Sequence, residues 1–442
     1  MRSLGRAGVP VYAITEDRWT PAAVSRYLVD HFTWPTTGAE PITELRSGLL
    51  GVAERIGRAA IAIPTDDKAA TLLAEQFGPG DPLIIPKISP WLPRVLASKR
   101  RLTELCGQVG IPTPAAEYAA SAADLLAYAE AGPFPVAVKK VDSWGTTQAR
   151  AVENTTIIWS PEELVKLAMR SPAATDVMLQ EYIPADAAED WVFHMYCDAE
   201  SNCRVAFTGI KLRSWPPRGG ATATARIVSN ETVAELSMRL CKEIGYRGIG
   251  DLDWRFDRRD GRYKLVDFNP RVGAQFRLFE TDVGIDVVRA LHLDLSGRPV
   301  PAGSQVEGRR FLAENLFALG MFAPRTRAAL APPLPPARGK VELAWLALDD
   351  PLPVLSMVVR FTAGMTRRVG LRALALLRPW GRHARARAAS AALIRGAANA
   401  VPATNLSNGP KVAAAGKPVK NSPGIDDSEA RVSTGQPTTL RS

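Results

Sequence analysis

The sequence predicts an α/β protein built from several lobes. Strand and helix signals alternate over residues 1–95, and a strand–turn–strand pattern rich in acidic residues spans residues 248–272. A basic, apolar helical pattern follows residue 350. At 442 residues, with 46% hydrophobic and 23% charged side chains, the chain is globular in composition and too long for one core.

Residues 1–95 predict a small parallel α/β layer. Strand-like runs at Val9–Ile14, Ala59–Ile63 and Pro82–Ile85 are separated by helical stretches. Arg2–Gly8 is typical of the end of a helix, so the strand and glycine turn that normally open such a layer are missing. We expect a truncated layer or a start site placed too late. An upstream extension of roughly 10–20 residues should then improve solubility by covering an unpaired edge.

Residues 96–300 alternate helices and buried strands. The expected elements are a helix over Ala97–Val109 capped by Ser98, a helix after the capping box Ser160–Glu163, a helix capped by Asn230, strands Pro135–Val141 and Val177–Ile183, a hairpin of Trp191–Cys197 with Arg204–Leu212, and strands Ile249–Phe256 and Tyr263–Asn269.

Regular patterning weakens after Pro301. We expect a linker at Ala331–Pro336, a strand at Leu343–Leu348 and a basic helical stretch over residues 353–395. Residues 396–442 contain no aromatic residue and predict a disordered tail.

The cysteines and histidines limit which disulfides, metal sites and catalytic groups we expect. The four cysteines show no C-x-x-C spacing, so we expect reduced thiols in a cytoplasmic protein (Cys106, Cys197, Cys203 and Cys241). The four histidines are scattered, which gives little support to a zinc site or a Ser-His-Asp triad. Any metal should be a hard cation on oxygen ligands. No signal peptide or apolar run of roughly 18 residues is visible, which favours the cytoplasm.

The strongest chemical signal is the acidic pair of strands within Gly248–Val272. Alternation places Asp251, Asp253 and Arg255 on one face of the first strand, and Tyr263, Leu265, Asp267 and Asn269 on one face of the second. A turn centred near Asp260 puts Asp253 opposite Asp267, and Asp251 opposite Asn269. Opposed carboxylates are unfavourable unless a cation lies between them, and Mg²⁺ prefers such oxygen ligands. The alternative is a solvated polar face.

Lysines upstream supply cations for an anionic ligand. Lys139 lies within an apolar strand, where burial is costly unless the ammonium meets an anion such as polyphosphate. Lys99 opens a helix that follows a strand, and Lys211 or Arg213 ends another strand. A surface position is the alternative for Lys99. The backbone at Gln180–Ile183 could read an adenine edge, with Glu189 or Asp190 holding ribose hydroxyls.

In order and spacing these motifs resemble the ATP-grasp superfamily. They are Lys99 with Gly110–Pro114, Phe134–Lys139, Gln180–Pro184, Phe207–Arg213 and Asp253 with Asp267–Arg271. Within it they resemble the carboxylate–amine ligases of the D-alanine–D-alanine ligase and D-aspartate ligase type, over about residues 1–300. The resemblance implies ATP and Mg²⁺ (or Mn²⁺) as cofactors and small-molecule carboxylate and amine substrates, joined through an acyl phosphate with release of ADP and phosphate.

The resemblance also implies a role for each matching residue. Lys99 and Lys139 would contact the ATP phosphates, and Lys211 or Arg213 the γ-phosphate. Glu181, the backbone near Ile183, and Glu189 or Asp190 would hold adenosine. Asp253, Asp267 and Asn269 would bind two Mg²⁺, and Arg271 would stabilise the acyl-phosphate region.

It implies a domain plan as well. A pre-ATP-grasp α/β domain would span residues 1–95, with its first strand apparently missing. A two-lobed ATP-grasp domain would span 96–300, with a small lobe at about 96–182 and a large lobe at about 183–300. A C-terminal extension would span 301–395 and a disordered tail 396–442.

Several positions depart from the family pattern. The family usually carries Glu where Asp267 stands, and often Arg where Asp251 stands. The segment Asp142–Gln148 holds a single glycine where a Gly-rich lid is normal. A degenerate protein that binds nucleotide without ligase turnover, in a regulatory or scaffold role, is therefore the alternative function.

The net charge of +10 is concentrated near the C-terminus. Residues 351–400 carry nine arginines and no Asp, Glu or Lys. Residues 352–395 therefore predict either a segment packed on the body with solvated arginines or a weak peripheral contact with anionic membrane. No helix-turn-helix pattern is recognisable, so a specific nucleic-acid partner is not expected.

Overall fold

The structure is a computed structural model that describes residues 1–34, 36, 40–141, 155–170, 176–216, 220–321, 339 and 341–366. All of these belong to one compact unit, Met1–Val369. The expected lid at 142–148, the linker at 331–336, the basic segment beyond 366 and the tail lie outside the described residues. None of the described helices is long and apolar enough to cross a membrane.

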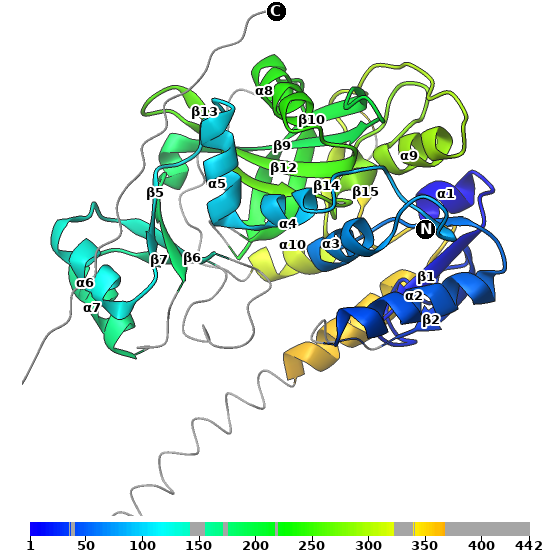
Figure 1. Ribbon diagram of the computed structural model, residues 1–442, viewed down its shortest axis with the longest axis horizontal. Helices are drawn as coiled ribbons and strands as arrows, with labels where there is room; N and C mark the ends of the chain where they lie inside the picture. The colour runs from blue at the N-terminus through cyan, green and yellow to red at the C-terminus, as the bar shows by residue number, and fades with distance from the viewer. Residues whose placement is uncertain are drawn as a thin grey trace, which may run out of the picture. The chain divides into compact units, whose positions relative to one another are not determined.

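Among the described residues, seven strands form the largest sheet, in the order β13-β12-β9-β10-β11-β14-β15 (Figure 1). Its strands are β9 (Ala188–Cys197), β10 (Cys203–Trp215), β11 (Ala221–Ile227), β12 (Gly248–Asp257), β13 (Arg262–Asn269), β14 (Arg310–Leu312) and β15 (Val341–Leu343). All neighbours run antiparallel except β14 and β15. The two predicted strand pairs are confirmed, and β11 was not predicted.

Helices cover both faces of this sheet. On one face α8 (Glu231–Glu243) and α5 (Lys99–Gln108) pack against a core that includes Phe193, Leu252 and Trp254. On the other face α9 (Val287–Leu295) and α1 (Arg2–Arg6) pack against residues such as Val192 and Phe207. The predicted cap of α8 is confirmed, because the Asn230 side chain accepts a hydrogen bond from the amide of Val233.

A four-stranded sheet, β5-β8-β6-β7, forms a separate small layer in the described part of the chain. Its strands are β5 (Ala116–Ala119), β6 (Val136–Lys140), β7 (Thr155–Ile158) and β8 (Val177–Glu181), covered by α6 (Ala122–Ala131) and α7 (Pro161–Arg170). The Ser160 hydroxyl accepts a hydrogen bond from the amide of Glu163 at the start of α7, as the capping box predicts. The small sheet thus carries Lys139, whereas Lys211, Asp253 and Asp267 lie on the large sheet.

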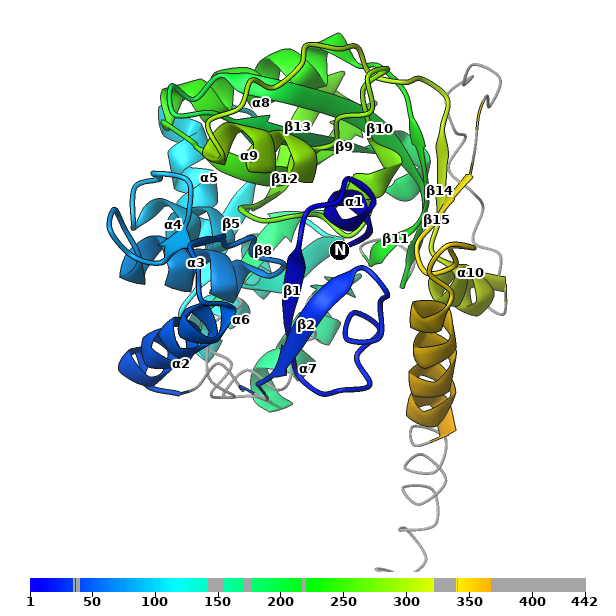
Figure 2. The same cartoon turned by 90° about the vertical axis from the view of Figure 1, so that its right-hand side faces the viewer.

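The N-terminal 97 residues form two parallel strand pairs in place of the expected single layer. β1 (Val11–Thr15) pairs with β2 (Leu28–Thr33) (Figure 2). Among the residues described, β3 (Ala60–Ile61) also pairs with β4 (Leu83–Ile84). The helices of this part are α2 (Ile42–Ile56), α3 (Asp67–Gln76) and α4 (Leu92–Ala97). Lys99 therefore follows a helix, not the strand that the sequence predicts.

The segment after residue 300 returns to the N-terminal part. It contains α10 (Glu314–Met321) and a helix over residues 352–366. The predicted strand Leu343–Leu348 is wrong, because pairing ends at Leu343. The carboxylate of Glu314 instead accepts hydrogen bonds from the amides of Trp345 and Leu346, which removes these donors from a ladder.

Candidate active site

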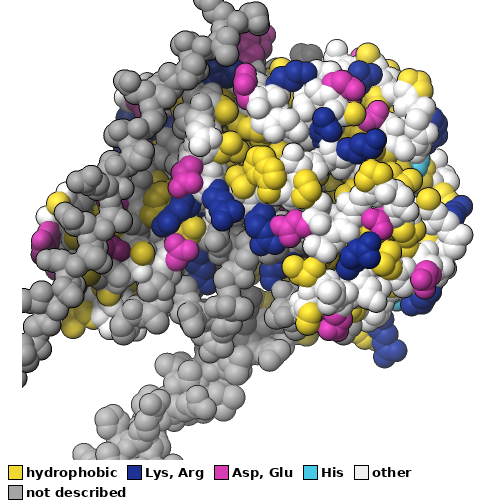
Figure 3. All heavy atoms as spheres, in the orientation of Figure 1, with side chains coloured by type: hydrophobic (Ala, Val, Ile, Leu, Met, Phe, Trp, Pro, Cys, Tyr) yellow, Lys and Arg dark blue, Asp and Glu magenta, His cyan; other side chains and the backbone are white. Residues whose placement is uncertain are grey.

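A cleft of about 490 Å³ lies between the two sheets. Eight predicted site residues line it: Lys99, Lys139, Glu181, Ile183, Asp190, Lys211, Asp253 and Asp267. In Figure 3 basic side chains gather beside acidic ones in the region between the two sheets. Four predicted residues are absent from the lining, namely Glu189, Arg213, Asn269 and Arg271.

The acidic pair has the predicted register. Asp253 is the cross-strand partner of Asp267, and Asp251 is that of Asn269. Each cleft acid faces a lysine. Nζ of Lys211 lies 2.6 Å from Asp253, and Nζ of Lys99 lies 3.6 Å from Asp267. Both carboxylates keep about a third of their side-chain surface exposed, at 31% and 32%. They can therefore exchange these lysines for a cation.

A β-bulge between Asp253 and Trp254 corrects one prediction about β13. The expected common face of Tyr263, Leu265, Asp267 and Asn269 does not exist, because Leu265 pairs with Trp254 and packs in the core beneath α8. Val266 is the extra residue, and it lines the cleft next to Asp267. A bulge of this kind re-aims the side chains on either side of it.

Lys139 on β6 is buried and bonded to one partner from the neighbouring strand. Its ammonium donates a hydrogen bond of 2.6 Å to Oε1 of Gln180 on β8. Burial, followed by the positive charge of Lys99, lowers the pKa of Lys139 to about 8. A buried ammonium with a neutral partner is stabilised by an anion placed in the cleft, as the sequence predicts.

Lys211 on β10 reaches across β9 to Asp253 on β12. Burial alone would lower the pKa of Lys211, but Asp253 and Asp251 raise it above its ordinary value. Burial raises the pKa of Asp253, against the lowering effect of Lys211. Of the two predicted candidates, Lys211 occupies the cleft. Arg213 is exposed, with its guanidinium 5.9 Å from the ring centre of Phe317.

Arg271 and Asn269 form a network beside the cleft. The Arg271 guanidinium donates to Oδ1 of Asn269 (2.8 Å) and to Asp251 (3.2 Å), and it lies 3.4 Å from Asp67 of α3. The Asn269 amide nitrogen donates to the backbone carbonyl of Asp251. Asn269 is therefore engaged on both sides of its amide, and its oxygen would have to leave Arg271 to ligate a metal.

The other side of Asp251 meets a buried histidine. Nε2 of His194 lies 3.0 Å from Oδ1 of Asp251, and its ring stacks on Phe279. Burial alone would raise the pKa of Asp251, but His194 and Arg271 hold it at about 2. Asp251 thus stays ionised and fixes Arg271.

The cleft also carries residues expected to hold adenosine. Asp190 lines it and pairs with Arg255 (2.7 Å). Glu189 points elsewhere, because its carboxylate accepts from Trp191 and pairs with Arg258. Glu181 lines the cleft while paired with Arg259 and Lys264. Tyr182, Trp191 and Trp254 add aromatic surface there.

Three residues with contacts at the site were not predicted for it. Gln180 holds Lys139, and Arg255 ties Asp190 to the carbonyl of Ile183. Asp67 approaches Arg271 from the N-terminal part. Gln180 and Arg255 occur inside motifs that sequence reasoning had singled out, so alternation along their strands could have found them. Asp67 lies about 200 residues from its partner, and no local pattern marks it.

Residues 98–294 match the family model described as the carbamoyl-phosphate synthase L chain, ATP binding domain. These residues form an ATP-grasp domain. The match ends inside α9 and so includes both sheets' cleft residues.

Curated relatives match parts of this chain. The D-aspartate ligase of Enterococcus faecium is 27% identical over 163 residues, which is 35% of this chain and 38% of that protein. The biotin carboxylase of Allochromatium vinosum is 21% identical over 174 residues, or 38% of this chain and 37% of that protein. The chain thus spans less than two fifths of the length of either relative.

Solved structures share the fold. Biotin carboxylase from Campylobacter jejuni superposes with a TM-score of 0.53 at 13% identity, covering 70% of each chain. N5-carboxyaminoimidazole synthetase from Staphylococcus aureus gives 0.52 at 12% identity, covering 69% of this chain and 75% of that one. At such identities the similarity establishes the architecture around the ATP-grasp domain and nothing finer.

Proposed function

We propose that the protein is an ATP- and Mg²⁺-dependent ligase that joins a carboxylate to an amine and releases ADP and phosphate. One observation carries the proposal. Asp253 and Asp267 oppose one another in a cleft that also contains Lys99, Lys139 and Lys211. Paired acids beside three ammonium groups suit a polyanion bound together with divalent cations. The similarity to D-aspartate ligase supports amide formation as the reaction.

The residues present fit Mg²⁺ at one end of the cleft. Asp253 and Asp267 would hold it, because both are partly exposed carboxylates whose lysine partners can turn to phosphate. Bound there, the metal would neutralise charge on the phosphates. The Hydrogenobacter thermophilus carboxylase domain with this fold, TM-score 0.51, was solved with MgADP. Asn269 would join only by giving up its bond to Arg271.

The lysines and the aromatic side chains of the cleft would orient ATP. Lys99 and Lys139 would bind phosphate oxygens, and Lys211 would hold the transferring phosphate next to Asp253. Adenosine would lie against Tyr182 and Trp191, with Asp190 accepting from ribose. The phosphoryl group then passes to the substrate carboxylate, and the amine displaces phosphate from the acyl carbon. To stabilise the negative charge that develops on the acyl phosphate, Arg271 would have to give up part of its network with Asn269 and Asp251. If Arg271 keeps that network, its role is to position Asn269 and Asp251.

The experiment is ATP consumption with a panel of carboxylates and amines, in the wild type and in Asp267→Ala. Amide product with ADP and phosphate, lost in the variant, supports the proposal. AMP and pyrophosphate as products would contradict it. Nucleotide binding without turnover on any pair would favour the degenerate, regulatory alternative.

A second candidate property concerns the helix over residues 352–366. Its outer face exposes apolar side chains (Leu352, Leu355, Val358, Val359 and Met365), with Leu348 just before it at 94% exposure. Its inner face buries Met357, and Arg360 pairs with Asp17. This exposure supports the proposal that residues 352–395 contact an anionic membrane surface from the cytoplasmic side.

A further inference from the structure

Three of the four cysteines converge at one end of the large sheet. Cys197 ends β9, Cys203 begins β10 and Cys241 lies on α8. Their Sγ atoms all lie within 4.8 Å of one another, and those of Cys197 and Cys203 are 3.1 Å apart. Three separate elements therefore each place one thiol at the same point, although the spacing of the cysteines in the sequence does not predict a cluster.

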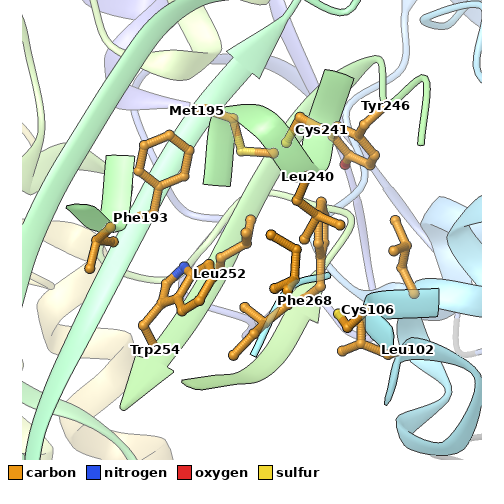
Figure 4. Packing of buried hydrophobic residues seen from close by; sticks show 14 of the residues in the cluster. Leu102, Cys106, Phe193, Met195, Leu240, Cys241, Tyr246, Leu252, Trp254 and Phe268 are labelled. Atoms are coloured by element: carbon orange, nitrogen blue, oxygen red, sulfur yellow. The ribbon is translucent and has the colours of Figure 1, made fainter. Parts of the chain in front are cut away.

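The side chains around the three thiols are mainly apolar and include one thioether. Cys197 and Cys241 are fully buried in the core cluster that also contains Met195, Leu240 and Tyr246. Figure 4 shows the thioether of Met195 directed toward Cys241. Cys203 is half-buried and gives the cluster a route to solvent.

The spacing suits a thiophilic ion. Sulfur ligands about 2.3 Å from a zinc-type ion lie roughly 3.8 Å from each other in tetrahedral geometry. The Sγ–Sγ distances run from 3.1 Å to at most 4.8 Å, on either side of this tetrahedral value. To bind the ion, the Sγ atoms of Cys197 and Cys203 must therefore move apart by about 0.7 Å. A disulfide would need the same pair to close to about 2.05 Å and would leave Cys241 without a role.

The charge near the cluster is mixed, because the carboxylate of Asp198 lies beside Cys197 and pairs with the guanidinium of Arg204 (3.8 Å). Three thiolates and a divalent ion carry one net negative charge, which is costly to bury without a nearby cation. Arg204 and Lys242 adjoin two of the ligands in sequence. Lys242 donates to the carbonyl of Glu200 (2.8 Å) and to Asn202 (3.0 Å), which holds the turn between β9 and β10 against α8.

We infer that Cys197, Cys203 and Cys241 form a binding site for a soft, thiophilic metal ion such as Zn²⁺ or Cu⁺. Binding replaces up to three S–H protons by metal–sulfur bonds and releases those protons to solvent. The site would fasten the β9–β10 hairpin to α8. It lies at the far end of β9 from Asp190, seven residues or about 24 Å along the strand, so it is separate from the proposed ATP cleft.

The test uses the reduced full-length chain, freed of metal and titrated with Cd²⁺ in excess Mg²⁺. We expect one Cd²⁺ per chain with a thiolate charge-transfer band, which distinguishes sulfur ligands from the carboxylates of the cleft. Cys203→Ala, at the least buried ligand, should abolish the band. Cys106→Ala is the matched control, because Cys106 is buried in the same core but stands outside the cluster.

Thermal melting gives the second measurement. Cd²⁺ or Zn²⁺ should raise Tm of the wild type and of Cys106→Ala but not of Cys203→Ala. The inference is overturned if reduced wild type shows no stoichiometric band, or if Cys203→Ala binds as the wild type does. A Cys197–Cys203 disulfide in air, with no metal affinity after reduction, overturns it too. All readouts are independent of ligase activity.

Discussion

At the scale of single residues, the two cleft acids differ from their neighbours in having exchangeable partners. We predict that Asp253→Asn and Asp267→Asn each lower Mg²⁺-dependent turnover about 100-fold or more, because each removes a ligand charge from the metal. Steady-state rates at saturating Mg²⁺ measure this, with circular dichroism as the check on folding. Asp186→Asn, at an exposed acid outside the cleft lining, is the control and should be neutral. Near-normal rates in either cleft variant would show that the pair does not hold the metal.

Lys139 predicts a pH dependence of nucleotide binding. With a pKa of about 8, its ammonium is present at pH 7 and is lost as the pH rises through 8, so affinity for ATP should fall by up to about tenfold per unit above that value. Burial, Lys99 and Arg255 lower the pKa of Lys139, whereas Asp267 and Asp253 raise it, and the uncharged Gln180 accepts a hydrogen bond from the ammonium.

Binding of ATP measured by calorimetry from pH 7 to pH 9 tests this dependence. Lys139→Met should bind more weakly at pH 7 and show a flat profile. Lys140→Met, next along the same strand, should keep the wild-type slope. An unchanged slope in Lys139→Met would assign the titration to another group.

At the scale of elements, alternation with a turn assumed near Asp260 predicted which acids oppose each other, although the register next to the turn differs from the predicted one by one residue. The pairing of Asp253 with Asp267 is as predicted, but it does not follow from the observed turn: continued without a break from Asp257 opposite Arg262, the register would place Val266 opposite Asp253, and the bulge shifts it to Asp267. The bulge could not be predicted, since Val266 is as suitable for a regular strand as for a bulged one. The thiol cluster was missed for a related reason: its members come from three elements, and only packing brings them together.

The helix over residues 352–366 gives the prediction at this scale. The chain should co-sediment with vesicles of anionic lipid at low salt and be released at high salt, since each arginine near such a surface contributes about 1 kcal/mol. Replacing Leu352, Leu355 and Val359 by Ser should weaken binding while keeping the buried contact of Met357. Vesicles of neutral lipid are the control. No binding at low salt, or binding unchanged after deletion of 352–400, would remove the membrane proposal.

At the scale of the whole molecule, the start of the chain is tied to residues 345–350. The guanidinium of Arg2 donates to Asp350 (2.8 Å) and to the carbonyl of Trp345 (2.7 Å), and Asp350 is 1% exposed. The hydroxyl of Ser25 also donates to Asp350. Sequence patterns could not predict this tie, because the partners lie 348 residues apart and neither belongs to a motif.

Asp350→Ala should therefore destabilise the fold by about 3–5 kcal/mol, because it leaves the buried Arg2 without its counter-ion. Urea unfolding measures the loss. Asp349→Ala is the matched control one residue away: its carboxylate is 41% exposed and pairs with the exposed Arg6, so the cost should stay within about 1 kcal/mol. Equal losses in the two variants would contradict a special role for Asp350.

The bulge in the acidic hairpin also affects how this chain can be aligned with others. Residues before it pair so that their numbers add to 520, and residues after it pair so that they add to 519. A relative whose hairpin is regular lacks the position that Val266 occupies. Any correct alignment with such a relative must open a one-residue gap there. An ungapped alignment anchored on the Asp257–Arg262 turn would match Val266 to the relative's metal-binding acid, and would wrongly score this chain as having lost it.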